Sequence, residues 1–213
     1  MPYLLVFMLS IFTLTGCQSA YYSAMEQVGY HKRDIMVDRV EDAKESQQDA
    51  QEEFTSALEA LTALTKFNGG ELEGMYNQVN DKYQDSEKAA QNVSDRIAAI
   101  EDVSDALFDE WQAELELYTS SSLRRSSEQK LRETKASYKT MLSAMKRAEK
   151  KMDPVLNTLR DNTLYLKHNL NASAVGSLQG DFMSLEKDIA YAIKQMNTAI
   201  TESDKFLERL NTQ

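Results

Sequence analysis

Along most of the chain, apolar and small residues recur at alternating intervals of three and four, with charged and amide residues between them. Such spacing places an apolar stripe along one side of an α-helix, and when it is sustained it is typical of coiled coils and helical bundles. No stretch shows the two-residue alternation of a strand. Clusters of helix-breaking residues interrupt the stripe at 68–70, 119–122 and 169–173. The pattern therefore predicts an all-α fold with four helices, at about 20–67, 71–118, 123–169 and 173–211.

The first two predicted helices also show how they pair. Gln47 lies 22 residues before Gly69 and Gln91 lies 22 residues after it, so an antiparallel hairpin that turns at Gly69 would place small residues opposite small residues. The same register brings Phe54 close to Tyr83. The fourth helix has a wide apolar face, which favours a multi-helix core over a two-stranded coiled coil. We therefore expect an elongated antiparallel four-helix bundle of up-down-up-down topology, about 65–70 Å long.

Charge differs sharply between the second and third predicted helices. Residues 71–118 contain 13 acidic and 3 basic side chains, whereas residues 123–151 contain 10 basic and 3 acidic ones. In one interpretation, the basic third helix packs beside the acidic helices and the charges offset each other. In the other, the third helix presents a basic face to an anionic lipid or glycan. Both interpretations stay open at this point.

A proline lies inside the third predicted helix. Asp153-Pro154 could begin a new helix, because Pro is well placed at a first helical position. The apolar stripe continues through this point without a skip, from Met152 to Val155 and Leu159. We therefore expect a kink at about 150–152 rather than a break.

The N-terminal residues have the pattern of an export signal. The stretch from Tyr3 to Leu14 is apolar apart from Ser10 and Thr13, and it is too short to span a bilayer. It leads into Leu-Thr-Gly-Cys, which resembles the lipobox of bacterial lipoproteins, although no Lys or Arg precedes it. We expect residues 1–16 to be a cleaved signal peptide and Cys17, the only cysteine, to become the lipidated N-terminus. By the same resemblance, Gln18 indicates the periplasmic face of the outer membrane. The alternative for Cys17 is a free or buried thiol.

On this basis the mature chain divides into two parts. Residues 17–30 would form the lipidated N-terminus with a tether or the first helix turns, and residues 31–213 would form the helical body. No later apolar run is long enough to span a membrane.

The sequence lacks the motifs of several functional classes. A net charge of −10 argues against nucleic-acid binding. Phosphate-binding loops, Glu-x-x-His di-iron pairs, haem attachment motifs and nucleophile elbows are also missing. We therefore expect no catalytic residue, no cofactor and no metal, and a non-enzymatic protein. A hydrolase built on an unrecognised carboxylate pair is a further alternative.

Two short stretches carry more aromatic, basic and amide groups than their neighbours. They supply the residues of a candidate contact surface, namely His31, Lys32 and Arg33 in the first stretch and Tyr165, Lys167, His168 and Asn171 in the second. The simpler interpretation is a surface histidine near a helix start and another near a helix end. In an up-down bundle the two stretches would lie at opposite ends, so they could not share one catalytic or metal site. The first could then face anionic headgroups and the second the periplasm.

The segments YYSAMEQVGYHKRDIMVDRVEDAKESQ and LYLKHNLNA resemble an uncharacterised family of Gram-negative envelope lipoproteins. That family is known only as a domain of unknown function and is expected to form a helical coiled coil. The resemblance implies a compartment and an architecture but no activity. We expect a scaffold or adaptor that meets the membrane through its lipid anchor, binds an unidentified envelope protein or glycan, and is able to self-associate. The alternative is a bundle that binds a lipid or small ligand.

Overall fold

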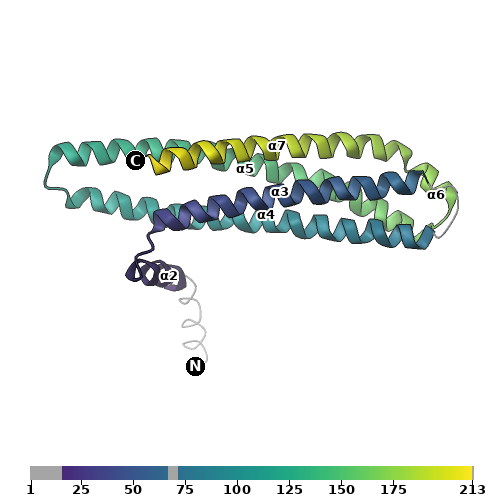
Figure 1. The fold of residues 1–213 in the computed structure, drawn as a ribbon, viewed down its shortest axis with the longest axis horizontal. Coiled ribbons are helices and arrows are strands. Elements are labelled where there is room, and N and C mark those ends of the chain that lie inside the picture. The colour runs from purple at the N-terminus through teal and green to yellow at the C-terminus, as the bar shows by residue number, and fades with distance from the viewer. Residues whose placement is uncertain (1–15, 67–71, 213) are drawn as a thin grey trace, which may run out of the picture.

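The computed structural model describes residues 16–66 and 72–212, and every regular element in these ranges is helical. The elements are α2 (Gly16–Gln27), α3 (Lys32–Thr65), α4 (Leu72–Glu114), the 3₁₀ turn η1 (Leu115–Leu117), α5 (Ser121–His168), α6 (Ala172–Ser177) and α7 (Gln179–Asn211). Helices α3, α4, α5 and α7 lie side by side in an elongated antiparallel bundle (Figure 1). The predicted all-α bundle is therefore confirmed. The expected turn at 68–70 and most of the expected signal peptide lie outside the described residues.

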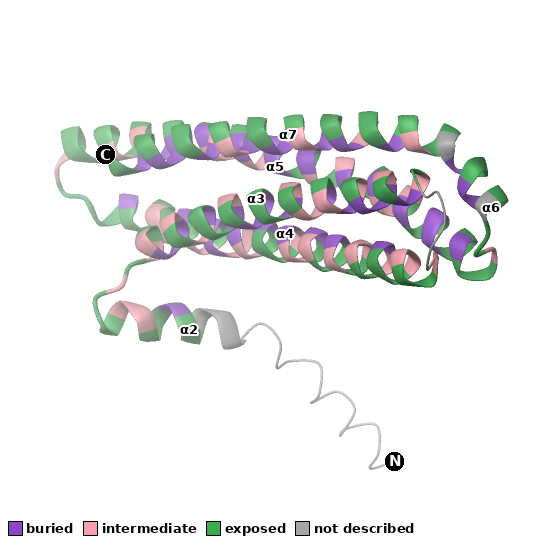
Figure 2. Cartoon of the chain, turned by 45° about the vertical axis from the view of Figure 1, so that its right-hand side comes forward, coloured by how far each residue is buried: buried purple, intermediate pink, exposed green. Residues whose placement is uncertain are grey.

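The bundle consists of two helical hairpins packed against each other. Helix α3 makes its most extensive contacts with α4, and α5 makes its most extensive contacts with α7. The buried faces of the helices point toward the shared axis (Figure 2). The predicted stripe of the first helix is buried throughout, at Met36, Val40, Ala43, Gln47, Ala50, Phe54, Ala57, Leu61 and Leu64. Burial of each larger side chain stabilises the fold by about 1.5–3 kcal/mol, so this stripe is what holds α3 in place.

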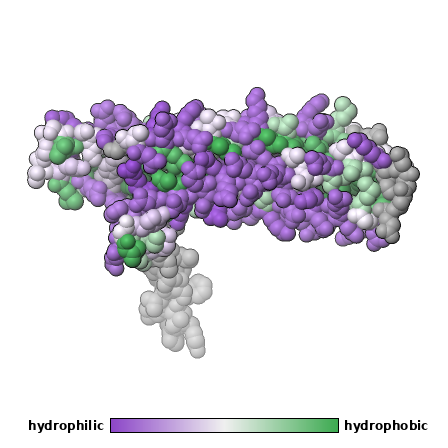
Figure 3. All heavy atoms as spheres, in the orientation of Figure 1, coloured by the Kyte–Doolittle hydropathy of each residue, from purple (hydrophilic) through white to green (hydrophobic). Residues whose placement is uncertain are grey.

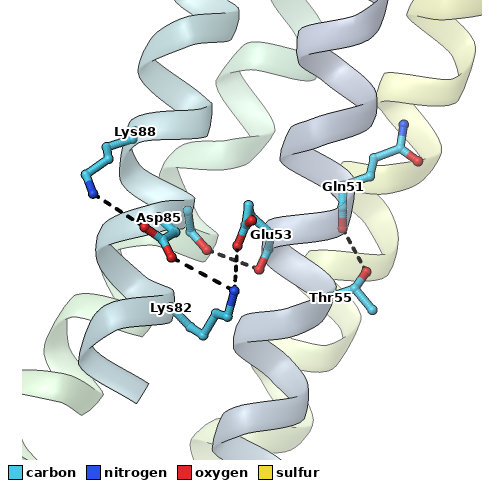
Figure 4. Close-up of polar contacts among 7 residues, drawn as sticks. Gln51, Glu53, Thr55, Lys82, Asp85 and Lys88 are labelled. Carbon is cyan, nitrogen blue, oxygen red and sulfur yellow. Dashed lines mark hydrogen bonds and ion pairs between the residues drawn. The ribbon is translucent and has the colours of Figure 1, made fainter. Parts of the chain in front are cut away.

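Contacts between α3 and α4 confirm the predicted hairpin register. Arg96 pairs with Asp42 at 3.1 Å, and each of these residues is 27 positions from Gly69. The Ser86 hydroxyl donates to the Glu53 carbonyl at 3.3 Å. Lys82 reaches across to the Glu53 carboxylate at 3.2 Å (Figure 4). The first two contacts centre the pairing register of α3 and α4 within a residue of Gly69, as the sequence predicts.

The expected continuous helix over 20–67 is wrong, because the chain breaks between α2 and α3. Gly29 has a φ of +83°, which a glycine adopts without the penalty of other residues. The Gly29 N–H donates to the Glu26 carbonyl at 2.9 Å, and the Tyr30 N–H donates to the Met25 carbonyl at 3.0 Å. This pair of bonds is a Schellman motif, which ends α2. His31 then begins α3 through a capping box with Asp34.

The other helices follow the prediction more closely. Helix α5 runs without a break through Pro154, so the prediction that the helix continues there is confirmed. The last predicted helix, over 173–211, is divided at Leu178 into the short α6 and the long α7. Asn171 begins α6, because its side-chain oxygen accepts from the Ala174 N–H at 3.0 Å.

One end of the bundle is built from two helices instead of four. The α4–η1–α5 hairpin continues past the start of α3 and the end of α7 (Figure 1). Most of this extension is exposed, in contrast to the four-helix body (Figure 2). Tyr118, the last residue of the helix predicted over 71–118, is 41% exposed because neither α3 nor α7 reaches that level.

Candidate functional sites at the two ends of the bundle

Helix α2 docks on the bundle through a buried tyrosine. Tyr22 is 3% exposed, and its O–H donates to the Asp102 carboxylate on α4 at 2.5 Å. Burial, followed by this hydrogen bond, raises the pKa of Tyr22 far above its ordinary value, so the phenol stays a donor. Arg39 of α3 contacts the same carboxylate at 3.3 Å and lies 5.9 Å from the Tyr22 ring. Residues of three helices therefore meet at this contact.

Lys32 forms the second contact of the junction. Its ammonium group lies between the carboxylates of Glu26 on α2 and Glu110 on α4, with the latter at 2.9 Å. Burial opposes the charge on Lys32, but the two hydrogen bonds outweigh it and raise the pKa. The hydrogen bond from Lys32 lowers the pKa of Glu26 in turn. The Lys32 side chain is only 11% exposed, so it mainly links α2 to α4.

Arg33 connects the start of α3 to the end of α7. Its guanidinium donates to the Leu210 carbonyl at 2.5 Å. A cation at the last carbonyls of a helix also opposes the negative end of the helix dipole. Arg33 and Leu210 line a pocket of about 230 Å³, together with Leu107, Glu110, Trp111, Glu114 and Lys130. This pocket lies where the four-helix body gives way to the two-helix extension.

The expected contact surface at His31, Lys32 and Arg33 therefore makes most of its contacts within the chain. Lys32 and Arg33 have partners on α2, α4 and α7. His31 is exposed and caps α3. A role for these three residues in binding headgroups stays a prediction, and the contacts of the two cations reduce what they can offer.

The second predicted stretch lies at the far end of the rod. Tyr165 is 41% exposed, and Lys167 and His168 are also exposed in the last turn of α5. Asn171 caps α6. Two further apolar side chains near the end of α5 are exposed, because Leu164 is 52% and Leu170 is 40% accessible. This end thus presents a mixed aromatic, apolar and basic surface.

The two predicted histidine stretches do not meet. Helix α3 begins at one end of the bundle, whereas α5 ends at the other (Figure 1). His31 and His168 therefore belong to opposite ends, as the sequence predicts. Within residues 16–66 and 72–212, no group of three or more His, Cys, Asp and Glu side chains is arranged to hold a metal ion.

Several basic residues of α5 pack against their neighbours. Lys146 pairs with Glu101 of α4 at 2.5 Å, and Arg124 pairs with Glu116 of η1 at 2.6 Å. Lys151 lies 5.3 Å from the Tyr191 ring of α7. These contacts favour the first interpretation of the charge asymmetry, in which α5 packs beside the acidic helices.

A groove of about 600 Å³ separates α4 from α5 along the body of the bundle. Apolar side chains in it include Ala90, Met152 and Leu156, and its other lining residues are Glu87, Gln91, Ser94, Lys146, Glu149, Lys150 and Asp153. The core of the bundle contains an unusual polar residue. Gln47 is fully buried, and neither of its side-chain amide atoms has a hydrogen-bond partner.

Sequence reasoning missed Tyr22 and Asp102, because it extended the first helix through the break. The signal that could have found them is Gly29 followed by His31-x-x-Asp34, a helix stop followed by a helix start. This pattern indicates that the residues before Gly29 form a separate helix. An amphipathic helix that is separate from the bundle needs its own docking contact.

None of the helices within 16–66 and 72–212 combines the length and apolar character needed to cross a bilayer. No curated protein matches the chain. A family model described as "Protein of unknown function (DUF2959)" matches residues 21–210, which include α3, α4 and α5 in full and all of α7 except its last residue. The chain therefore belongs to the DUF2959 family of proteins of unknown function.

Proposed function

We propose that the chain is a non-enzymatic lipoprotein of the cell envelope, anchored in the outer membrane and acting as a periplasmic coiled-coil scaffold or adaptor. The observation that carries this proposal is a long rod with a filled core and exposed apolar side chains at both ends. A rod of this kind holds two surfaces a fixed distance apart. The partner at the far end is an envelope protein or glycan.

The anchor in this proposal is an acylated Cys17. Its support is the apolar run from Tyr3 to Leu14, the small residues directly before Cys17, and the position of α2 at one end of the rod. Two or more acyl chains give stable membrane attachment, whereas one chain gives only marginal binding. Tyr22 and Lys32 would then transmit the attachment to the bundle.

The anchor is tested with a Cys17→Ser variant expressed with its native leader. We expect this variant to lose incorporation of a palmitate analogue and to leave the membrane fraction. A Gln18→Asp variant is the matched control, because it should keep the label and move to the inner membrane. An unchanged membrane fraction for Cys17→Ser would contradict the proposal.

The scaffold role is tested by photo-crosslinking in intact cells. A photoreactive amino acid at Leu164 or Leu170 should capture a specific envelope component, since both side chains are exposed at the far end. Gln48, which is exposed on the side of α3, is the control position. Identical crosslinking at all three positions, or none at any, would count against an adaptor with a recognition surface at its tip.

The second candidate function is binding of a lipid or small ligand. The observation that favours it is the groove between α4 and α5, which brings apolar side chains of Met152 and Leu156 together with Lys146 and Lys150. A zwitterionic amphiphile would fit the combination of these groups with the three acidic side chains of the groove. Titration of the purified chain with a fluorescent lysophospholipid tests it. Saturable binding that is weakened by Leu156→Glu, at a half-buried position, would favour the ligand-binding function over the scaffold.

A further inference from the structure

The tip of the two-helix extension exposes a compact set of apolar side chains. Leu117 is 79% exposed, Leu123 is 59% exposed and Tyr118 is 41% exposed. Hydrophobic surface is visible at this end of the molecule in Figure 3. All three residues lie in the seven positions 117–123, which run from the end of η1 to the first turn of α5. The tip is therefore a small apolar protrusion on a largely hydrophilic rod.

The two helices of the extension contact each other through other side chains. Leu115, which is 2% exposed, fills the space between the two helices. The Trp111 indole N–H donates to the Ser127 hydroxyl at 2.8 Å and links the helices a little further along. Ser120 begins α5 by accepting from the Leu123 N–H. Exposed leucines beyond this core add nothing to the hairpin itself, so their apolar character points to a contact outside the chain.

Charge at the tip differs in sign from charge on the rest of the molecule. Residues 115–125 contain one acidic side chain, Glu116, and two basic ones, Arg124 and Arg125. The chain as a whole has a net charge of −10. The first turn of α5 contains no acidic residue, so the positive end of the helix dipole is not offset there. An apolar tip with a positive rim is suited to an anionic or zwitterionic lipid surface and is less suited to a basic protein.

The tip lies at the same end of the rod as α2 (Figure 1). Lys32 fixes the end of α2 at the level of Glu110, and Leu117 lies seven positions after Glu110. At 1.5 Å per residue, this places the tip about 10 Å along the rod from the end of α2, and Cys17 lies nine residues, or about 14 Å, before Glu26 along α2. The undescribed residues 1–15, with their apolar run, join the chain at α2. A bilayer that holds the N-terminus is therefore within reach of the tip.

We propose that this tip, Leu117 to Arg125, is a second membrane contact that inserts into the headgroup region of the bilayer holding the N-terminus. The inference rests on the proposed membrane anchor and deepens it. Leucine and tyrosine are suited to the boundary between acyl chains and headgroups. Arg125 can bind lipid phosphate, whereas Arg124 pairs with Glu116 at 2.6 Å. A single lipid anchor lets the rod swing freely. Attachment at both the N-terminus and the tip fixes the direction in which the far end points.

The test uses the full chain purified from membranes and reconstituted into vesicles of phosphatidylethanolamine and phosphatidylglycerol. Ser122→Cys places an environment-sensitive fluorophore at the tip, and Ser173→Cys places the same fluorophore at the far end, where Ser173 is exposed. If Cys17 is acylated, the introduced thiol is the only free one in each variant. Labelling of the wild-type chain therefore reports separately on the anchor. Quenching by aqueous iodide and by brominated lipid measures the depth of each probe.

The expected result is that the tip probe is at least about threefold less accessible to iodide than the far-end probe and is quenched by brominated lipid. Leu117→Ser combined with Leu123→Ser should abolish this difference. Leu164→Ser combined with Leu170→Ser, a matched change at the other end, should leave it intact.

Two results would overturn the inference. The first is equal iodide accessibility at both ends in a chain whose anchor is intact. The second is protection of the tip probe from iodide that rises with the protein-to-lipid ratio, while brominated lipid does not quench the probe. This result would assign the tip to contacts between copies of the chain. Labelling of Cys17 in the wild-type chain would instead indicate that the anchor itself is absent, and this result is distinguishable from both.

Discussion

Replacing the buried Gln47 by methionine should stabilise the protein. Gln47 is fully buried near the middle of α3, and both of its amide atoms lack a hydrogen-bond partner. A buried polar group without a partner costs about 1–3 kcal/mol. Methionine has a similar length and a similar helix propensity, so the substitution removes the amide and changes little else. Gln48→Met is the matched control, because Gln48 is the next residue and is exposed.

The two amide atoms without partners determine how large a gain in stability we expect. After an allowance for imperfect packing of the thioether, we expect Gln47→Met to raise the free energy of unfolding by about 1–3 kcal/mol. For a protein of this size, each kcal/mol corresponds to about 2–4 °C in the midpoint of thermal unfolding. Urea and thermal unfolding followed by circular dichroism at 222 nm measure both quantities. The Gln48→Met control should change the free energy of unfolding by less than about 0.5 kcal/mol.

Loss of stability in Gln47→Met, or a change equal to that of Gln48→Met, would refute this reasoning. Either result would indicate that the amide has a partner in solution, such as a buried water molecule. The gain also bears on why the glutamine is present. A polar residue at a core position specifies the pairing of helices at a cost in stability, and Gln47 lies in the α3–α4 hairpin whose register centres on Gly69.

Three further predictions concern the α2 junction. Gly29→Ala should destabilise the junction by about 1–2 kcal/mol, because alanine does not tolerate the φ of +83°. Gly74→Ala is the control, since Gly74 lies in the first turn of α4 and nothing contacts an added Cβ there, so the change should not destabilise the protein. Thermal unfolding distinguishes the two. Tyr22→Phe should raise the rate of hydrogen exchange in α2 without changing the rate in α4. An equal change of the rate in both helices would contradict this. Acid should release α2. Lys32 lowers the pKa of Glu26 in the folded state, so the contribution of Glu26 to the stability of the junction is present above its ordinary pKa of about 4.5 and is lost as the pH falls below that value. Hydrogen exchange of α2 measured at pH 7 and at pH 3 would show this loss.

The core could be predicted from the sequence because the stripe repeats over many turns. Met36, Phe54 and Leu61 follow the spacing of three and four, and each is buried as that spacing requires. The register of α3 and α4 could be predicted because small residues face small ones on either side of Gly69. Both signals sum over many positions, so no single exception changes the result.

The junction and the tip could not be predicted in the same way. A single glycine, Gly29, ends α2, and one residue with a positive φ leaves no trace in a periodic pattern. Tyr118 continues the apolar stripe of α4, yet it is exposed because α3 and α7 do not reach it. The relative lengths of packed helices depend on tertiary structure, which the spacing within one helix does not reveal. The proposed lipid attachment of Cys17 would depend on a processing step that the folded body does not determine.

The measurement that tests the account most directly is the mass of the N-terminal peptide of the protein isolated from its native membranes. The account predicts a peptide that begins at Cys17 and carries the added mass of a diacylglyceryl group, with or without a third acyl chain. Recovery of the peptide with an unmodified Cys17, or of one that still begins at Met1, would contradict the proposed anchor. The attachment of the bundle and the role of its tip at the membrane would then have to be abandoned together.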